Sequence, residues 1–236
     1  MPEWDEFIRE NPDITHVDAM LFDLCGRAYG KRIPAAQAPS LFADGTPVCA
    51  AMSLVDVNGN TADPMGYGFS DGDPDGIARP VPGTLVRAPW TPGLAQVLCE
   101  PRHAVTGEPF WYDPREILAR VVGRLNGDGL FPVVACELEF YLVSPARDDG
   151  GRPLPARSPA NGRPENAGNV LSLAKLDEYQ PVLDDVLEAC RIQGVPATTI
   201  ISEYGAGQFE VNLQHRADPV RAADDALLLR RVVQAV

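Results

Sequence analysis

Residues 136–143 read CELEFYLV and residues 202–213 read SEYGAGQFEVNL, and both stretches carry glutamates inside short apolar runs. Alternate residues of a β-strand share one face, so Glu137 and Glu139 point to one side of the first stretch and Leu138 points to the other. Burying an unpaired carboxylate costs several kcal/mol, so such glutamates need a partner or solvent. The pattern predicts a strand with an apolar back and an acidic front.

The second stretch repeats this alternation, with Glu210 and Asn212 on one face and apolar residues such as Phe209 on the other. The run Gly205-Ala206-Gly207 is a turn signal, which predicts that Glu203 lies on an antiparallel neighbour of Glu210. If the strands share a sheet, the carboxylates converge as oxygen ligands for a hard divalent cation. A solvated acidic face on an ordinary amphipathic strand is the alternative for either stretch alone.

Bulk properties narrow the function classes. The 236 residues fit one large domain or two modest ones, and the formal net charge of -13 argues against nucleic acid or an anionic membrane as partner. Five scattered cysteines without CxxC spacing suggest a reducing compartment. Neither a signal peptide nor an apolar run of roughly 18 residues is visible, which predicts a cytoplasmic protein.

The first half of the chain is typical of short strands separated by turns. We expect four strands, which cover Thr15–Leu24, Gly30–Pro34, Leu85–Ala88 and Ala95–Cys99. The first two should form a hairpin. The stretch Asp56–Gly83 is rich in Gly, Asp and Pro, and we interpret it as a surface loop. The functional alternative is a loop that closes over a site.

The second half is typical of helices and strands in alternation. Asp113-Pro114 and Asp218-Pro219 each predict an N-cap followed by proline at the first helical position. We expect helices from Pro114 to Gly127, over Asp177–Gln193 and from Pro219 to the last residue, a strand over Val195–Ile201, and irregular structure over Ser144–Asn169. Because the last helix reaches the final residue without a stop signal, we expect the chain to be an N-terminal portion of a longer protein.

Several motifs occur together in a fixed order. They are E-x-E-F-Y-L at 137–142, E-Y-G-x-G-Q-x-E-V-N-L at 203–213 and D-P-x-x-A-A-D at 218–224. Together with DLCGRAYGKRIP at 23–34, VPGTL at 81–85 and DPREIL at 113–118, they resemble the glutamine synthetase superfamily. DVNGN, GDPDG and the long motif around Glu203 look closest to the branch of γ-glutamylpolyamine and γ-glutamylamine synthetases.

The resemblance implies an ATP-dependent ligase that joins the γ-carboxylate of glutamate to an amine or polyamine through a γ-glutamyl phosphate. It implies that Glu139, Glu203 and Glu210 bind the metal nearest glutamate, and that Glu137 binds a second metal on the nucleotide side. The cofactors implied are ATP and Mg²⁺ or Mn²⁺, and the donor type agrees with either metal. The family's nucleotide-binding residues mostly correspond to positions beyond residue 236.

The resemblance also implies an α+β fold. An N-terminal β-grasp-like domain should span residues 1–105, and residues 106–236 should begin a catalytic α/β domain with an antiparallel sheet. Family members form rings, so we expect a homo-oligomer. In such rings an acidic residue reaches the neighbouring subunit's site and helps to deprotonate the amine, and Asp71, Asp73 and Asp75 are the candidates for that role.

Some alternatives remain open at this stage. A glutamine synthetase that uses ammonia, or a truncated non-catalytic member of the superfamily, would carry the same motifs. Gln208 is either a turn residue or a residue that orients a metal ligand. His215 is interpreted as a surface or capping residue rather than a ligand.

Overall fold

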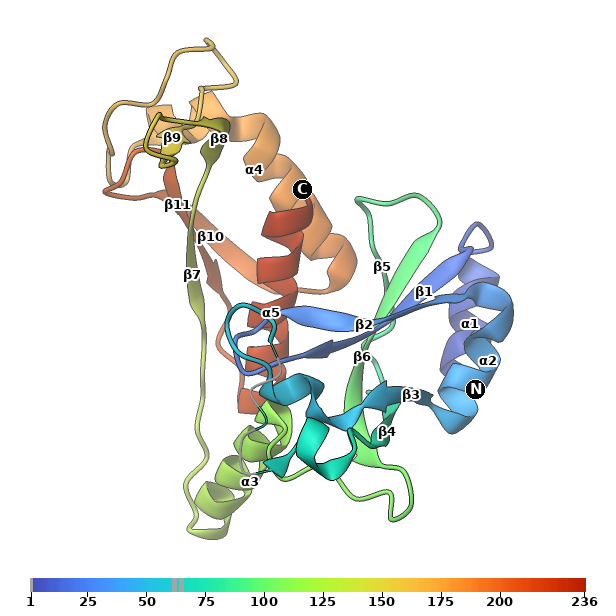
Figure 1. Cartoon of the computed structure of the whole chain (residues 1–236). Helices are drawn as coiled ribbons and strands as arrows, with labels where there is room; N and C mark the ends of the chain where they lie inside the picture. The colour runs from blue at the N-terminus through green and yellow to red at the C-terminus, as the bar shows by residue number, and fades with distance from the viewer. Residues whose placement is uncertain (1, 61–62, 64–65) are drawn as a thin grey trace. The chain divides into compact units, whose positions relative to one another are not determined.

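In the computed structural model, which describes residues 2–60, 63 and 66–236, the chain forms two compact units, Met1–Phe131 and Pro132–Val236 (Figure 1). Helices and sheets are mixed in the chain, as the α+β expectation requires. The β-grasp assignment and the domain boundary between residues 105 and 106 stay predictions. No helix in the described ranges is both long enough and apolar enough to cross a membrane.

The first unit is built on a sheet with the strand order β2-β1-β6-β4-β3, to which β5 adds by pairing with β6. Its elements are α1 (Pro2–Glu10), β1 (His16–Phe22), β2 (Ala28–Pro34), α2 (Ala38–Asp44), β3 (Thr46–Cys49), β4 (Asp75–Pro80), β5 (Val86–Arg87), β6 (Leu94–His103) and α3 (Pro114–Gly127). β1 and β2 form the predicted antiparallel hairpin, and β1 runs parallel to β6. Helices α1 and α2 meet where Trp4 stacks on Phe42 with ring centroids 5.8 Å apart.

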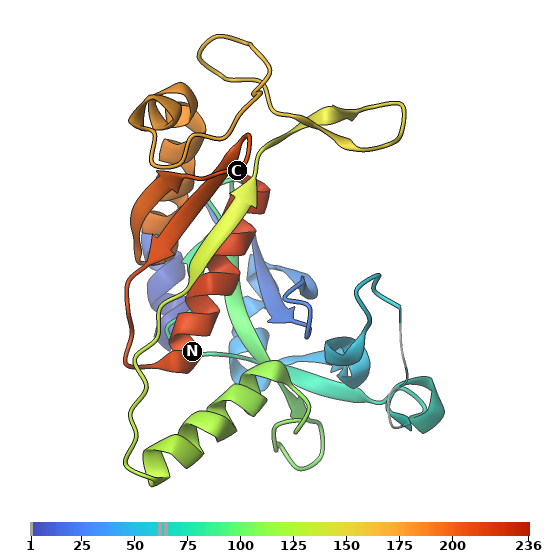
Figure 2. The same ribbon diagram turned by 90° about the vertical axis from the view of Figure 1, so that its left-hand side faces the viewer.

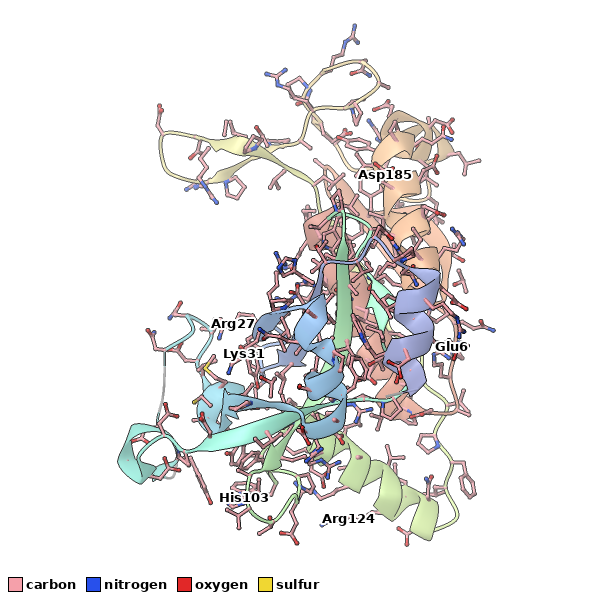
Figure 3. The ribbon with its side chains drawn as sticks, turned by 90° about the vertical axis from the view of Figure 1, so that its right-hand side faces the viewer. Glu6, Arg27, Lys31, His103, Arg124 and Asp185 are labelled. Atoms are coloured by element: carbon pink, nitrogen blue, oxygen red, sulfur yellow. The ribbon has the colours of Figure 1, made fainter. Side chains whose placement is uncertain are left out.

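Arg27 fixes the turn between β1 and β2 to a distant loop. Its Nε pairs with Asp23 at 2.8 Å, and its two terminal nitrogens donate to the carbonyl oxygens of Asp56 at 2.6 Å and Val57 at 3.2 Å. Arg27 and Lys31 mark this turn and the strand after it in Figure 3. Arg27 therefore attaches the loop of the DVNGN motif to the hairpin.

The prediction that Asp56–Gly83 is a loop is wrong for its last part, which contains β4. This strand pairs with β3 on one side and β6 on the other. Its sequence, DGIARP, has a single β-branched residue, so the local pattern is weak and the flanking strands decide the conformation. At Gly76 a Cβ would lie 2.7 Å from the ring of Phe110, so glycine lets the strand and the ring approach closely.

The second unit combines a three-stranded antiparallel sheet, in the order β10-β11-β7, with two helices. Its elements are β7 (Glu137–Tyr141), β8 (Val143–Arg147), β9 (Pro153–Pro155), α4 (Leu173–Gln193), β10 (Ala197–Ser202), β11 (Gln208–Leu213) and α5 (Pro219–Ala235). β8 and β9 form a hairpin inside the stretch expected to be irregular, and it extends beyond the end of β7 (Figure 2).

Helix boundaries follow their caps. Asp113 and Asp218 each accept hydrogen bonds from backbone N–H groups of the first turn, which confirms both predicted N-caps. α4 begins four residues before the predicted start, because the hydroxyl of Ser172 accepts from the Lys175 N–H and caps the helix there. It ends as predicted at Gly194, whose φ of 67° is left-handed.

The core of the second unit lies between the sheet and α4. Phe209 is 1% exposed and packs near the rings of Phe140 and Tyr179, at centroid distances of 6.2 and 5.0 Å. Leu183 of α4 belongs to the same buried cluster. The apolar back of β7 and β11 predicted from the sequence is therefore the surface on which α4 packs.

Replacing Phe209 by alanine should lower the free energy of unfolding by about 3–5 kcal/mol, because the cavity left between three packed side chains cannot close. The measurement is a urea titration in which circular dichroism monitors unfolding. Tyr204→Ala is the matched control, since that aromatic side chain in the same unit is 78% exposed. An equal loss of stability in both variants would contradict this account of the core.

The cysteines should differ sharply in reactivity. All five lie in the described part of the chain outside any disulfide; Cys25 is exposed, while Cys99 and Cys190 are buried. Burial raises the pKa of the Cys99 and Cys190 thiols to about 12, so neither is a thiolate near neutral pH. Ellman's reagent at pH 8 should label Cys25 in the native protein and these two only after unfolding. Equal native and denatured rates for Cys99 would contradict the burial.

Candidate active site

Three of the four glutamates are brought together by strand register. In the antiparallel pair of β11 and β7, Glu210 lies directly opposite Glu139, and Asn212 lies opposite Glu137. Directly opposed residues have Cβ atoms about 5 Å apart. Glu137, Glu139 and Glu210 therefore occupy one patch on one face of the sheet, as the sequence pattern predicts.

Glu203 joins the same face from the turn after β10. Ile201 is opposite Glu210, and Glu203 follows two residues later, so its side chain belongs to the same side of the sheet. Its N–H donates to the carbonyl oxygen of Gln208 at 2.9 Å, which extends the ladder by one residue pair. The antiparallel relation of Glu203 and Glu210 predicted from the glycine-rich turn is confirmed.

The four-glutamate face is the side of the sheet opposite α4. Phe209 and Phe140 point toward α4, so the alternate residues Glu210 and Glu139 point away from it. Figure 2 shows the sheet with α4 and α5 behind it and the other face toward the viewer. Glu137 and Glu139 are exposed, whereas Glu210 on the central strand is 9% exposed.

Neutral donors hold three of these carboxylates. Glu139 accepts from the side-chain amide of Gln208 at 2.5 Å, Glu210 accepts from the amide of Asn212, and Glu203 accepts from the Tyr204 N–H at 3.3 Å. Each carboxylate thus turns toward its own donor. Accordingly, no group of three acidic, His or Cys side chains within the described residues is gathered closely enough to hold a metal ion.

The face carries concentrated negative charge. Across the described part of the chain, no Lys or Arg forms an ion pair with any of the four glutamates. Like charges placed directly opposite in a strand pair destabilise the pair. Glu210 and Glu139 are such a pair, and Glu210 is also buried. A cation bound between them would relieve both costs, and carboxylate oxygens are the donors that Mg²⁺ and Mn²⁺ prefer.

A groove of about 790 Å³ begins at the Glu137 end of this face. Its walls come from β10, β11 and the segments next to them, with Ala135, Glu137, Thr198, Thr199, Asn212, Leu213, Gln214 and His215 as lining residues. His215 is exposed, as its interpretation as a surface residue predicts, and it also lines this groove. Sequence reasoning missed the groove because it depends on two strands whose pairing is not local.

The segment before α4 supports the end of β10. The Ser202 hydroxyl donates to the Asn169 carbonyl at 2.7 Å and accepts from the Ser172 N–H at 2.8 Å. Nearby, Lys175 pairs with buried Glu165 at 2.9 Å, and this hydrogen bond raises the pKa of the lysine. These contacts fix the backbone immediately before Glu203, and no sequence signal had marked them.

The three candidate aspartates lie in the first unit and are exposed. Asp71 accepts from the N–H groups of Gly68 and Asp73, and so caps its own turn. Asp73 accepts from the thiol of Cys49 at 2.6 Å. Asp75 begins β4. Their proposed role concerns a neighbouring subunit and stays a prediction.

One protein-family model and several known proteins match this chain. The family model described as glutamine synthetase, catalytic domain, matches residues 111–236. The chain is 35% identical over 232 residues to gamma-glutamylputrescine synthetase PuuA of Escherichia coli strain K12. The matched region covers 98% of this chain and 49% of PuuA. It is 28% identical over 195 residues to glutamate–isopropylamine ligase of a Pseudomonas species, covering 82% of this chain and 41% of the ligase.

Solved structures show the same fold. The structure of a GmaS/ADP complex superposes with a TM-score of 0.75 at 22% identity, and covers 100% of this chain and 49% of that one. A structure described as a novel glutamine synthase homolog gives a TM-score of 0.71 at 22% identity, over 94% of this chain and 49% of the other. The chain spans about half the length of the relatives it matches.

Proposed function

The chain belongs to the glutamine synthetase family, and we propose that the protein is an ATP-dependent ligase that joins the γ-carboxylate of glutamate to an amine. The observation that carries the proposal is the register that sets Glu210 opposite Glu139 on a face shared with Glu137 and Glu203. Carboxylates gathered on one face attract cations, and phosphoryl transfer depends on cations that neutralise phosphate charge.

The four glutamates fit divalent cations by the chemistry of their donors. We assign Glu139, Glu203 and Glu210 to one Mg²⁺ or Mn²⁺ and Glu137 to a second. When bound, the cations neutralise charge on the phosphate groups and on the γ-carboxylate of glutamate. The protein's own contribution is to place the four glutamate backbones on one face of a sheet, and the carboxylates would turn from their neutral donors to share a cation.

The groove beyond Glu137 is the proposed place for the nucleotide. It is open, polar along Thr198, Thr199 and Asn212, and contiguous with the carboxylate assigned to the second cation. In the proposed reaction a γ-carboxylate oxygen of glutamate attacks the γ-phosphorus of ATP, the bond to the β-phosphate oxygen breaks, and ADP leaves. The amine then attacks the carbonyl carbon of γ-glutamyl phosphate, loses a proton and expels phosphate. One of the aspartates Asp71, Asp73 and Asp75 of a neighbouring subunit in a ring is the proposed proton acceptor.

An amine larger than ammonia is the proposed acceptor. Support comes from the two relatives described above, whose names specify putrescine and isopropylamine. A gamma-glutamylethanolamide synthetase of Streptomyces coelicolor is also similar, at 30% identity over 215 residues. Glutamine synthetases match as well, at 28% identity over 170 residues, so ammonia belongs in any test.

The natural full-length protein should release phosphate from ATP only when glutamate and an amine are both present. The measurement is a phosphate-release assay with ammonia, methylamine, isopropylamine, ethanolamine, putrescine and spermidine in separate reactions, with the γ-glutamyl product identified by mass spectrometry. Turnover with ammonia alone would assign the protein to glutamine synthesis. No turnover with any acceptor would overturn the ligase proposal.

Neutralising a proposed ligand should abolish activity and weaken metal binding together. We expect Glu203→Gln and Glu210→Gln to lose measurable turnover and to bind Mn²⁺ at least 10-fold more weakly, because each removes a charged oxygen donor. Free Mn²⁺ is measured by electron paramagnetic resonance. Glu188→Gln is the matched control, since Glu188 is exposed on α4 and pairs with Arg191. Full activity in Glu203→Gln would show that the metal assignment is wrong.

A further inference from the structure

The side chain of Gln208 is bound at both ends. Its Oε1 accepts from the Gly205 N–H at 2.7 Å, and its Nε2 donates to Glu139 Oε2 at 2.5 Å. Its main chain takes part as well, since its carbonyl oxygen accepts from the Glu203 N–H at 2.9 Å. One residue therefore connects the turn, Glu203 and a carboxylate on the neighbouring strand.

The turn that carries Gln208 packs closely against β7 and the residue after it. A Cβ at Gly205 would lie 2.6 Å from the ring of Tyr141, so this backbone rests directly against β7. At Gly207, φ is 72° and a Cβ would lie 2.7 Å from the carbonyl oxygen of Leu142. Two glycines thus let the turn pack closely on the strand that holds Glu139. A side chain anchored in such a turn has a fixed reach.

We propose that Gln208 is a positioning residue that orients the carboxylate of Glu139 for a divalent cation. The inference rests on the proposed function, because it assigns Glu139 to a cation. The amide N–H occupies one oxygen of Glu139 and leaves Oε1 available. Its other end is fixed by the Gly205 N–H, so the amide cannot rotate and present its oxygen to the carboxylate. The amide adds no charge, so it orients Glu139 without competing for the cation.

If the Gln208 side chain only stabilised its own turn, it would need the contact with the Gly205 N–H but not the contact with Glu139. The turn is closed by the main-chain bond from the Gln208 N–H to the Gly205 carbonyl oxygen at 3.1 Å, and Oε1 adds a second bond within it. The bond from Nε2 to Glu139 contributes nothing to the turn itself. It joins residues 69 positions apart in the sequence. This hydrogen bond therefore orients the Glu139 carboxylate.

The test is Mn²⁺ affinity in Gln208→Met, measured by electron paramagnetic resonance on the full-length protein without ATP, glutamate or amine. Methionine keeps the length of the side chain but lacks both polar contacts. Loss of a residue that orients a metal ligand typically weakens metal affinity by about 10–100-fold, and this is the result expected. In a Glu139→Gln background the same change should have little further effect, because the carboxylate it orients is already gone.

Controls separate this effect from folding and from the ligase proposal. Gln180→Met replaces an exposed glutamine of α4 and should leave Mn²⁺ affinity unchanged. If Gln208→Met fails to fold, Gln208→Glu decides, since it keeps an acceptor for the Gly205 N–H but lacks the donor to Glu139; it should weaken Mn²⁺ binding despite its added negative charge.

If folded Gln208→Met binds Mn²⁺ with an affinity within twofold of wild type, the inference is overturned. It is also overturned if Gln208→Met weakens Mn²⁺ binding equally in the wild-type and Glu139→Gln backgrounds. Wild-type protein that binds Mn²⁺ normally but shows no ligase activity would overturn the proposed function alone. Wild-type protein that binds no Mn²⁺ would overturn both.

Discussion

The pairing of β7 with β11 determines where the carboxylates of the site lie. It sets Glu210 directly opposite Glu139, and a shift of one residue would move one of these carboxylates into the core against α4. The apolar side opposes such a shift, because Phe209 packs with Phe140 and Tyr179 in one buried cluster. Apolar packing on one face of the sheet thus fixes the positions of the glutamates on the other face.

The energetic cost of this arrangement points to its use. A carboxylate that is 9% exposed faces a second carboxylate across a strand pair, and amides rather than cationic side chains contact them. Proteins retain such clusters at functional sites, where a bound ion changes the balance of charge. The turn at Gly205–Gly207 and the segment around Ser202 then serve to hold Glu203 and Glu139 at fixed positions beside Glu210.

Much of this arrangement could be predicted from the sequence. Alternation of glutamates with Leu138 and Phe209 gives the two faces, and Asp113 and Asp218 give two helix starts, because these signals are local. The strand β4 was missed because its conformation depends on β3 and β6 rather than on its own residues. The hairpin of β8 and β9 was missed for a similar reason, since a proline interrupts β8 and prolines begin and end β9, which weakens any strand signal. The register and the contact between Gln208 and Glu139 join distant segments, so only the fold reveals them.

The most direct test of the account is a crystal structure of the full-length protein soaked in Mn²⁺, with anomalous diffraction to locate the ions. We predict one anomalous peak bonded to carboxylate oxygens of Glu139, Glu203 and Glu210, with the Gln208 amide still donating to Glu139, and a second peak at Glu137. Mn²⁺ bound elsewhere, with the four glutamates contacting only solvent and their neighbouring amides, would contradict the account.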